Sequence, residues 1–151
     1  MNDYIFCSVI AALVLYILYT RKKRSTKSKS INPYDRISVC MVINKSLKMS
    51  TGKIVAQIGH ALFNVVATFN QKQDMYDLWK QNEEDLVLYE ASIEEIKSLS
   101  SVLHKHSIPY SKIIDAGRTQ IPSGSNTVLI VGPGKSIEIS NLISHLQPFV
   151  K

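Results

Sequence analysis

Ile37-Ser38-Val39-Cys40-Met41-Val42-Ile43 is the stretch of this sequence that decides the fold. Every residue in it except Ser38 is apolar. A strand with one face in water alternates apolar and polar residues, whereas a nearly continuous apolar run is typical of a strand covered on both faces. We therefore expect residues 37–43 to form an inner strand of a sheet that is packed on both sides.

The chain after this strand alternates between helical and strand-like patterns. Apolar residues recur at helical spacing from about residue 52 to residue 70, and Ser50 or Thr51 is suited to cap the N-terminus of that helix. Gly132-Pro133-Gly134 is expected to end the last strand. The remaining patterns predict helices at 74–81, 93–106 and 136–145 and strands at 85–89, 110–114 and 126–131. This order predicts an α/β layer fold with a mixed sheet.

The N-terminus carries a second apolar run, from Tyr4 to Tyr19, interrupted only by Ser8. It is slightly shorter than the roughly 20 residues of an ordinary membrane-spanning helix. The block Arg21-Lys22-Lys23-Arg24 ends it, and such a block keeps the following chain on the cytosolic side. A buried helix of a soluble protein is the main alternative. A secretory signal peptide is disfavoured, because Asp3 and no Lys or Arg precedes the run.

Charge is distributed unevenly between the two ends of the chain. The formal net charge is +6, but residues 30–151 carry 12 Lys and Arg against 11 Asp and Glu. The basic character therefore belongs mainly to a short segment that lacks periodicity and should be flexible. We expect three parts: a membrane anchor over 1–20, a basic flexible linker over 21–34, and a folded domain over 35–151 that faces the cytosol.

The cysteines and histidines predict neither a disulfide nor a metal site. Cys7 lies in the N-terminal apolar run and Cys40 in the predicted inner strand, so both thiols are expected to be reduced and buried. His104 and His106 are two residues apart near a helix end and lack Cys or carboxylate neighbours. The sequence therefore predicts no metal and no other cofactor.

Lys53, Gln57 and His60 occupy one face of the helix that follows the inner strand, because they stand at i, i+4 and i+7. A cation in the first turn opposes the helix dipole by roughly 0.3–1 kcal/mol. A phosphate or a developing oxyanion at the helix N-terminus would offset that cost. The alternative, which spacing alone favours, is an exposed Lys53 that reaches water and a structural His60.

Asp115 follows a predicted strand, at the sheet edge where open α/β sheets bind their ligands. Gly117 permits a tight turn, and Arg118, Thr119 and Gln120 supply a guanidinium, a hydroxyl and an amide. Asp115 could bind and deprotonate a water that Thr119 positions. The alternative, again favoured for this stretch alone, is a turn in which the Asp115 carboxylate accepts the N–H group of Gly117 or Arg118.

Together these stretches resemble the peptidyl-tRNA hydrolase family of the archaeal and eukaryotic type (type 2). The resemblance covers Ile37 to the C-terminus and is specific in order and spacing. It rests on Leu47-Lys48-Met49, Gly52-Lys53, Ala56-Gln57, His60-Ala61, Asp115-Ala116-Gly117-Arg118-Thr119-Gln120, Pro122, Gly124-Ser125 and Gly132-Pro133-Gly134. It implies a mixed four-stranded sheet with helices on both faces. Eukaryotic members can carry an N-terminal membrane anchor, which fits Tyr4–Tyr19.

The resemblance also implies an activity and a set of functional residues. The activity is hydrolysis of the ester between a peptide, or an N-acyl-aminoacyl group, and the 3′ end of tRNA, which releases free tRNA without a metal. The catalytic residues would be Lys53, Asp115 and Thr119. The residues that support substrate binding would be Lys48, Gln57, His60, Arg118 and Gln120.

Residues 74–95 depart from the family pattern. They hold eight acidic groups and Lys80 as the single base. Family members also often carry a basic residue where this chain has Asn44. Because phosphate contacts largely set the affinity for tRNA, we expect this side of the domain to repel it.

A membrane-tethered adaptor or signalling protein that keeps the hydrolase fold without activity is the second hypothesis. Loss of basic residues favours it, whereas retention of Lys53, Asp115 and Thr119 disfavours it. The sequence is also compatible with a homodimer and with protein partners. It does not distinguish the mitochondrial outer membrane from the endoplasmic reticulum.

Overall fold

The computed structural model describes residues 32, 34–83, 85–117 and 120–150. All the helices and strands given below lie in one unit, which extends from Pro33 to Lys151. The expected membrane anchor, Tyr4–Tyr19, and nearly all of the expected linker lie outside the described residues.

Within the described ranges, no helix combines the length and the apolar character that a membrane crossing requires.

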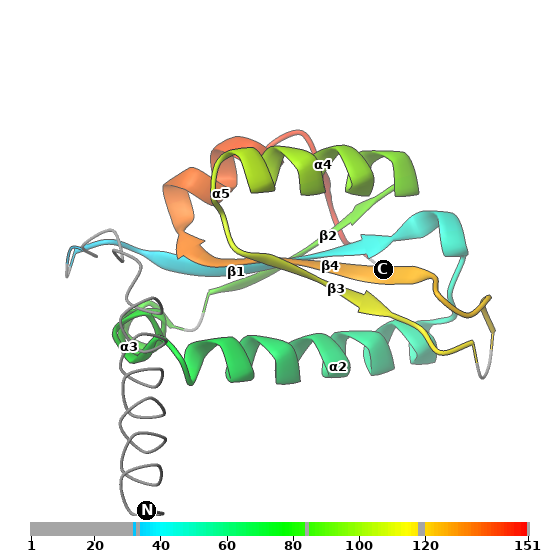
Figure 1. Cartoon of the computed structure of the whole chain (residues 1–151), viewed down its shortest axis with the longest axis horizontal. Coiled ribbons are helices and arrows are strands. Elements are labelled where there is room, and N and C mark those ends of the chain that lie inside the picture. Colours follow the sequence, from blue (N-terminus) through cyan, green and yellow to red (C-terminus); the bar gives the residue numbers. More distant parts are fainter. Residues whose placement is uncertain (1–31, 33, 84, 118–119, 151) are drawn as a thin grey trace, which may run out of the picture. The chain divides into compact units, whose positions relative to one another are not determined.

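The centre of the unit is a mixed sheet of five strands in the order β3-β4-β1-β2-β5 (Figure 1). Strand β1 pairs with β2 in parallel and with β4 antiparallel, while β3 and β5 pair antiparallel with β4 and β2. The strands are β1 (Ile37–Asn44), β2 (Leu86–Ala91), β3 (Tyr110–Ile114), β4 (Asn126–Lys135) and β5 (Gln147–Pro148).

The four-stranded sheet expected from the sequence is therefore wrong by one strand. Strand β5 has two residues, and its partners are Tyr89 and Glu90 of β2. Phe149 extends this contact by donating its N–H to the Leu88 carbonyl over 2.9 Å. A two-residue strand that contains Pro148 has no apolar alternation, so the sequence carries no pattern from which it is predicted.

Strand β1 confirms the expectation of an inner strand, because every one of its residues is buried. Helices α2 (Thr51–Phe69) and α3 (Gln73–Gln81) cover one face of the sheet. Helices α4 (Ile93–Lys105) and α5 (Ser136–Ile143) cover the other face (Figure 1). A short 3-10 turn, η1 (Lys45–Leu47), connects β1 to the approach of α2. The continuous apolar run is thus explained by burial on both faces.

Clusters of apolar side chains among the described residues hold the helices on the sheet. On the side of α4 and α5, Cys40 and Val42 pack with Ile96, Leu99 and Leu103. Cys40 is a free, buried cysteine, as expected, and burial raises the pKa of its thiol to about 12. Around the start of α2, a smaller cluster consists of Ile43, Met49, Ile54 and Ile121.

Strand β4 continues through Gly132-Pro133-Gly134 to Lys135, so the predicted end of the strand at this tripeptide is wrong. The pairing with β1 shifts register between Ser38 and Cys40, which leaves an extra residue in β4 opposite β1. Gly132 has φ +96°, and a Cβ there would lie 2.8 Å from the Ser38 carbonyl oxygen. The glycine therefore allows the strand to pass an irregularity at close range.

Candidate active site at the ends of β3 and α2

The predicted functional side chains meet where β3 ends and α2 begins. Asp115 directly follows Ile114, the last residue of β3. Ser50 caps α2, because its hydroxyl accepts the Lys53 N–H over 3.3 Å. The Gln120 amide oxygen accepts the Ser50 N–H, also over 3.3 Å. Gln120 is therefore held against the N-terminus of α2.

Lys53 and Asp115 are in direct contact, with the ammonium Nζ donating to Oδ1 of the carboxylate. Their side chains are only 12% and 7% exposed. Lys53 therefore does not simply extend into water, which was the simpler of the two interpretations. The carboxylate lies near the first turn of α2, where a negative charge offsets the unfavourable interaction of a cation with the helix dipole.

Gln57 connects this ion pair to the sheet. Its Nε2 donates to Asp115 Oδ1 over 3.2 Å, and its Oε1 lies 2.6 Å from the Thr127 hydroxyl. The same hydroxyl lies 3.0 Å from the Ile113 carbonyl. Gln57 and Thr127 are both buried. The amide is consequently fixed with its nitrogen toward the carboxylate and its oxygen toward the hydroxyl.

Thr127 is a residue of this network that the sequence analysis did not identify. In the pairing of β3 with β4, Ile113 is opposite Val128 and Ile114 is opposite Asn126. Thr127 is therefore the extra residue of a bulge. Bulges redirect side chains, and this one places the Thr127 hydroxyl against Gln57 of α2. A single threonine in an apolar strand gives no signal of such a role, because register shifts are not encoded locally.

Gly117 supplies a third donor to the carboxylate. Its N–H donates to Asp115 Oδ2 over 2.9 Å, which is the turn considered as the alternative explanation of Asp115. Gly117 has φ +74°, and a Cβ at this position would lie 2.5 Å from the Ser123 nitrogen. The turn and the ion pair therefore coexist, each using a different oxygen of Asp115.

These donors determine the charge state of Asp115. The hydrogen bond from Lys53 lowers the pKa of Asp115, and the Gly117 N–H, the Lys53 charge and the Gln57 amide lower it further against the effect of desolvation. Asp115 is consequently a carboxylate at neutral pH. A carboxylate with a lowered pKa is a good acceptor for the proton of a bound donor, but a weaker base than an ordinary one.

The other predicted site residues are placed less centrally. Lys48 is exposed and has the left-handed φ of 48° at the end of η1. His60 is exposed on α2, on the turn after Gln57. Gln120 is exposed and reaches Ser50, as described above. Arg118 and Thr119 lie outside the described residues. Where the structure is described, no group of three or more His, Cys, Asp and Glu side chains could hold a metal ion.

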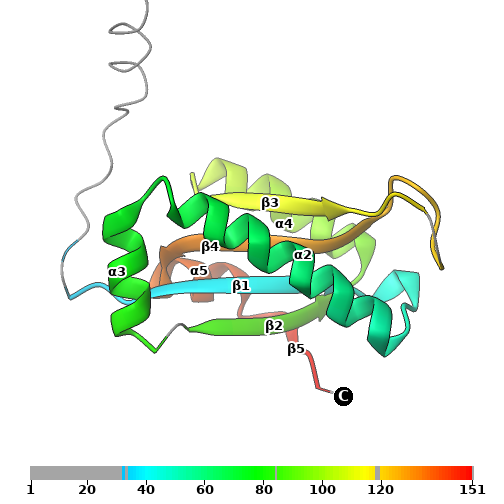
Figure 2. The same cartoon turned by 90° about the horizontal axis from the view of Figure 1, so that it is seen from below.

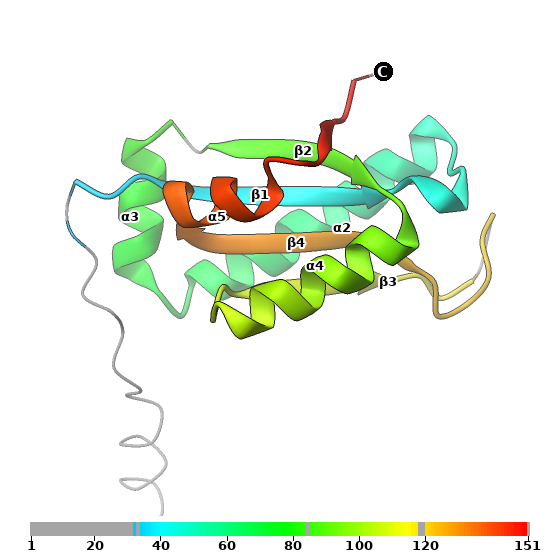
Figure 3. The same cartoon turned by 90° about the horizontal axis from the view of Figure 1, so that it is seen from above.

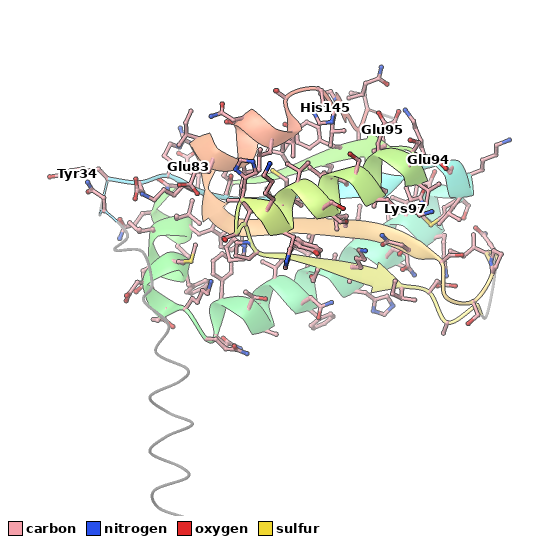
Figure 4. The ribbon with its side chains drawn as sticks, turned by 45° about the horizontal axis from the view of Figure 1, so that its top comes forward. Tyr34, Glu83, Glu94, Glu95, Lys97 and His145 are labelled. Atoms are coloured by element: carbon pink, nitrogen blue, oxygen red, sulfur yellow. The ribbon has the colours of Figure 1, made fainter. Side chains whose placement is uncertain are left out.

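Three acidic residues of 74–95, Glu83, Glu94 and Glu95, lie at two different ends of the domain. Glu83 follows α3, at the end of the domain where Tyr34 also lies, while Glu94 and Glu95 begin α4 at the other end, close to Lys97 (Figure 4). The Glu95 carboxylate accepts the Ser92 N–H over 2.7 Å, so this acid caps α4. Acidic residues that the sequence analysis expected to repel tRNA are thus found in two separate regions.

Comparisons with known proteins show the family of this chain. The family model described as "Peptidyl-tRNA hydrolase PTH2" matches residues 37–149. The chain is 33% identical over 114 residues to "Peptidyl-tRNA hydrolase" of Thermococcus onnurineus, which covers 74% of this chain and 97% of that protein. It is 34% identical over 109 residues to "Peptidyl-tRNA hydrolase 2, mitochondrial" of Homo sapiens, and this match covers 71% of this chain and 61% of that protein. A match to "Peptidyl-tRNA hydrolase" of Methanocaldococcus jannaschii is 30% identical over 113 residues and covers 74% of this chain and 98% of that protein. The chain therefore belongs to the peptidyl-tRNA hydrolase PTH2 family.

Proposed function

We propose that this chain hydrolyses the ester bond between a peptide, or an N-acyl-aminoacyl group, and the 3′ end of tRNA, which frees the tRNA for reuse. Family membership supports this activity. The observation that carries it is the buried contact of Lys53 with Asp115, which Gln57 braces. An adaptor that had only inherited the fold would not need such a preorganised charge pair, so the adaptor hypothesis is not favoured.

The proposed reaction is the addition of water to the ester carbonyl carbon. The water oxygen bonds to that carbon, and the bond from the carbon to the ribose 3′ oxygen breaks. One proton of the water ends on the 3′ oxygen of tRNA, and the other atoms complete the new peptide carboxyl group. The transition state places a negative charge on the former carbonyl oxygen, so catalysis requires an oriented water and a positive charge.

We assign these roles to three residues. Asp115, held as a carboxylate by Lys53, Gln57 and Gly117, orients the attacking water by accepting one of its hydrogen bonds. Its lowered pKa makes orientation a larger part of its role than proton abstraction. Thr119 positions the same water. Lys53 supplies the positive charge for the developing oxyanion or for the terminal phosphate and ribose.

Substrate binding would use cationic and polar groups around this centre. Lys48, His60, Arg118 and Gln120 are the proposed contacts to tRNA, and the buried Gln57 supports binding by holding Asp115 in place. Contacts to phosphate set most of the affinity of a protein for RNA, and each one increases its dependence on salt. We therefore expect tRNA binding to weaken steeply as the salt concentration rises.

Release of tRNA from an N-acetyl-aminoacyl-tRNA by the full chain tests the activity, with Asp115→Asn as the test variant. The control is Asp35→Asn, which removes the partner of Lys135 across a 2.7 Å contact. Lys135 is the last residue of the ten-residue strand β4, whereas Asn126, the first residue of β4, pairs with Ile114 next to Asp115. Asp35 is therefore remote from Asp115. Release that is lost in Asp115→Asn and kept in Asp35→Asn is expected. Equal release by wild type and Asp115→Asn would rule out the assigned site.

We further propose that Tyr4–Tyr19 anchors the chain in a membrane, that 21–34 is a flexible basic linker, and that 35–151 is the hydrolase domain. The length and apolarity of the run and the basic block after it support the anchor. The names of the human relative and of a bovine relative include "mitochondrial", which favours a mitochondrial location over the endoplasmic reticulum. Carbonate extraction of cell membranes tests the anchor, because extraction of the full chain into the soluble fraction would exclude it.

A further inference from the structure

Strand β3 is an edge strand, and within the described residues it pairs with β4 alone. Figure 2 and Figure 3 show it at the rim of the sheet from two opposite sides. The opposite edge of the sheet is partly covered, because β5 and Phe149 pair with β2 along Leu88–Glu90. Among the residues that the structure describes, part of one edge is therefore covered, and the edge that leads to Asp115 is open.

The backbone hydrogen bonds of β3 show which of its groups face outward. The Pro109 carbonyl accepts the Gly132 N–H over 2.7 Å, and the Asp115 N–H donates to the Ser125 carbonyl over 2.9 Å. The Ile113 carbonyl oxygen lies 3.0 Å from the Thr127 hydroxyl of β4. These odd-numbered residues direct their backbone groups to β4.

Neighbouring residues of a strand direct their backbone groups to opposite edges. Lys112 and Ile114 therefore direct their N–H and C=O groups away from β4, toward the open side. Such a row of outward groups is a template for pairing with another extended chain.

An apolar side chain marks the end of this edge next to the site. Ile114 is 54% exposed and immediately precedes Asp115. Its side chain lies on the face of the sheet opposite to that of Asp115, because successive side chains of a strand alternate. An extended ligand along β3 would therefore meet an apolar contact just before it reached the Lys53–Asp115 pair.

We propose that the open edge of β3 binds the peptide part of the substrate as an added strand. This inference rests on the proposed function. Strand β3 runs toward Asp115, so only a peptide parallel to β3 brings its C-terminal ester to that residue. Hydrogen bonds between main chains do not depend on the side chains of the peptide. Such pairing therefore suits a substrate whose peptide sequence varies.

The pairing has a signature with a period of two residues. In a strand added to β3, every second peptide residue directs its N–H to Lys112 or Ile114, and the residues between direct theirs to solvent. Methylation of an N–H that pairs should lower kcat/KM by roughly two- to tenfold, which is the contribution of one backbone hydrogen bond. Methylation of the amides between should have little effect.

The first test uses the wild-type full chain and tRNAs that carry one pentapeptide sequence, N-methylated at a single amide in each substrate. The expected result is a decrease in kcat/KM at alternate amides only. Equal kcat/KM for all methylated and unmethylated substrates would overturn the β3 assignment and leave the hydrolase activity established. Absence of release from every substrate would instead overturn the proposed function, and this inference with it.

The second test changes the enzyme. Lys112→Pro removes the outward N–H, and proline is tolerated on edge strands because the pairing with the inner neighbour is kept. An N-acetyl-aminoacyl group, about two residues long at roughly 3.3 Å each, is too short to extend from Asp115 to Lys112. Lys112→Pro should therefore reduce kcat/KM for the pentapeptidyl substrate by roughly two- to tenfold relative to that for N-acetyl-aminoacyl-tRNA.

Ser111→Ala is the matched control, because it changes an exposed side chain on β3 whose backbone groups face β4. It should leave the ratio of kcat/KM for the two substrates as in wild type. Thermal unfolding of each variant reports whether Lys112→Pro folds. A folded Lys112→Pro variant with the wild-type ratio would overturn the assignment.

Discussion

Thr127 Oγ1 lies 2.6 Å from Gln57 Oε1, and this hydrogen bond joins the sheet to α2 directly behind the Lys53–Asp115 pair. Because a carboxamide has one oxygen and one nitrogen, fixing the oxygen on Thr127 directs the nitrogen to Asp115. A residue of a β-bulge thereby orients a residue that itself orients the proposed catalytic carboxylate.

Thr127→Val should impair catalysis without preventing folding, because valine has the shape of threonine but no hydroxyl. The buried Gln57 oxygen would lose its donor, which costs roughly 1–3 kcal/mol of folding stability. Release of the amide from this orientation should lower kcat by about tenfold, which corresponds to roughly 1.4 kcal/mol in the barrier. Urea unfolding and steady-state kinetics measure the two effects. Thr68→Val, which removes an exposed hydroxyl bonded to the Asn64 carbonyl, is the control and should change neither.

The Lys53–Asp115 pair should contribute stability that depends on pH. The contact with Lys53 lowers the pKa of Asp115 in the folded protein. Its contribution to the free energy of unfolding is therefore complete above the unfolded pKa of about 3.9 and is lost as the pH falls through the lower folded value. The stability difference between wild type and Asp115→Asn should be largest at neutral pH and decrease below about pH 4. Urea unfolding at several pH values measures it, and a difference that grows on acidification would contradict the assignment.

Gly117→Ala should abolish the geometry of the site, whereas Gly124→Ala should be tolerated better. Both glycines have positive φ, +74° and +82°, so each substitution adds left-handed strain of roughly 1–2 kcal/mol. Only at Gly117 would the new Cβ also meet backbone atoms, at 2.5 Å from the Ser123 nitrogen. The difference between the two variants in kcat and in thermal stability therefore measures the effect of the steric clash at Gly117. Similar effects of both substitutions would show that strain alone accounts for them.

Lys48→Gly should stabilise the protein while it weakens binding of tRNA. Lys48 holds a left-handed φ of 48°, which costs roughly 1–2 kcal/mol in a residue other than glycine. Relief of that strain, less the greater chain entropy of glycine of roughly 0.5–1 kcal/mol, leaves a gain of up to about 1.5 kcal/mol. If Lys48 contacts a phosphate, the slope of log affinity for tRNA against log salt should decrease by roughly one. Lys45→Gly, at an exposed neighbour with φ outside the left-handed region, lacks the strain and should not gain stability.

The sequence by itself determined the elements whose patterns are local. The inner strand β1, the helices α2 and α4, and the cap at Ser50 are all where periodicity and capping rules predict them. This is because hydrophobic spacing and cap chemistry depend on residues a few positions apart. The motifs around Lys53 and Asp115 likewise identified the family, since their order along the chain is a property of the sequence alone.

Only the tertiary structure decided what joins those motifs. Lys53 and Asp115 are 62 positions apart, and neither stretch alone favoured a functional interpretation over a solvated lysine or a simple turn. The role of Thr127 depends on a register shift between β3 and β4, and the open edge beside Asp115 depends on the order of the strands. Register and strand order are set by packing between distant segments, which is why no local pattern in the sequence contains them.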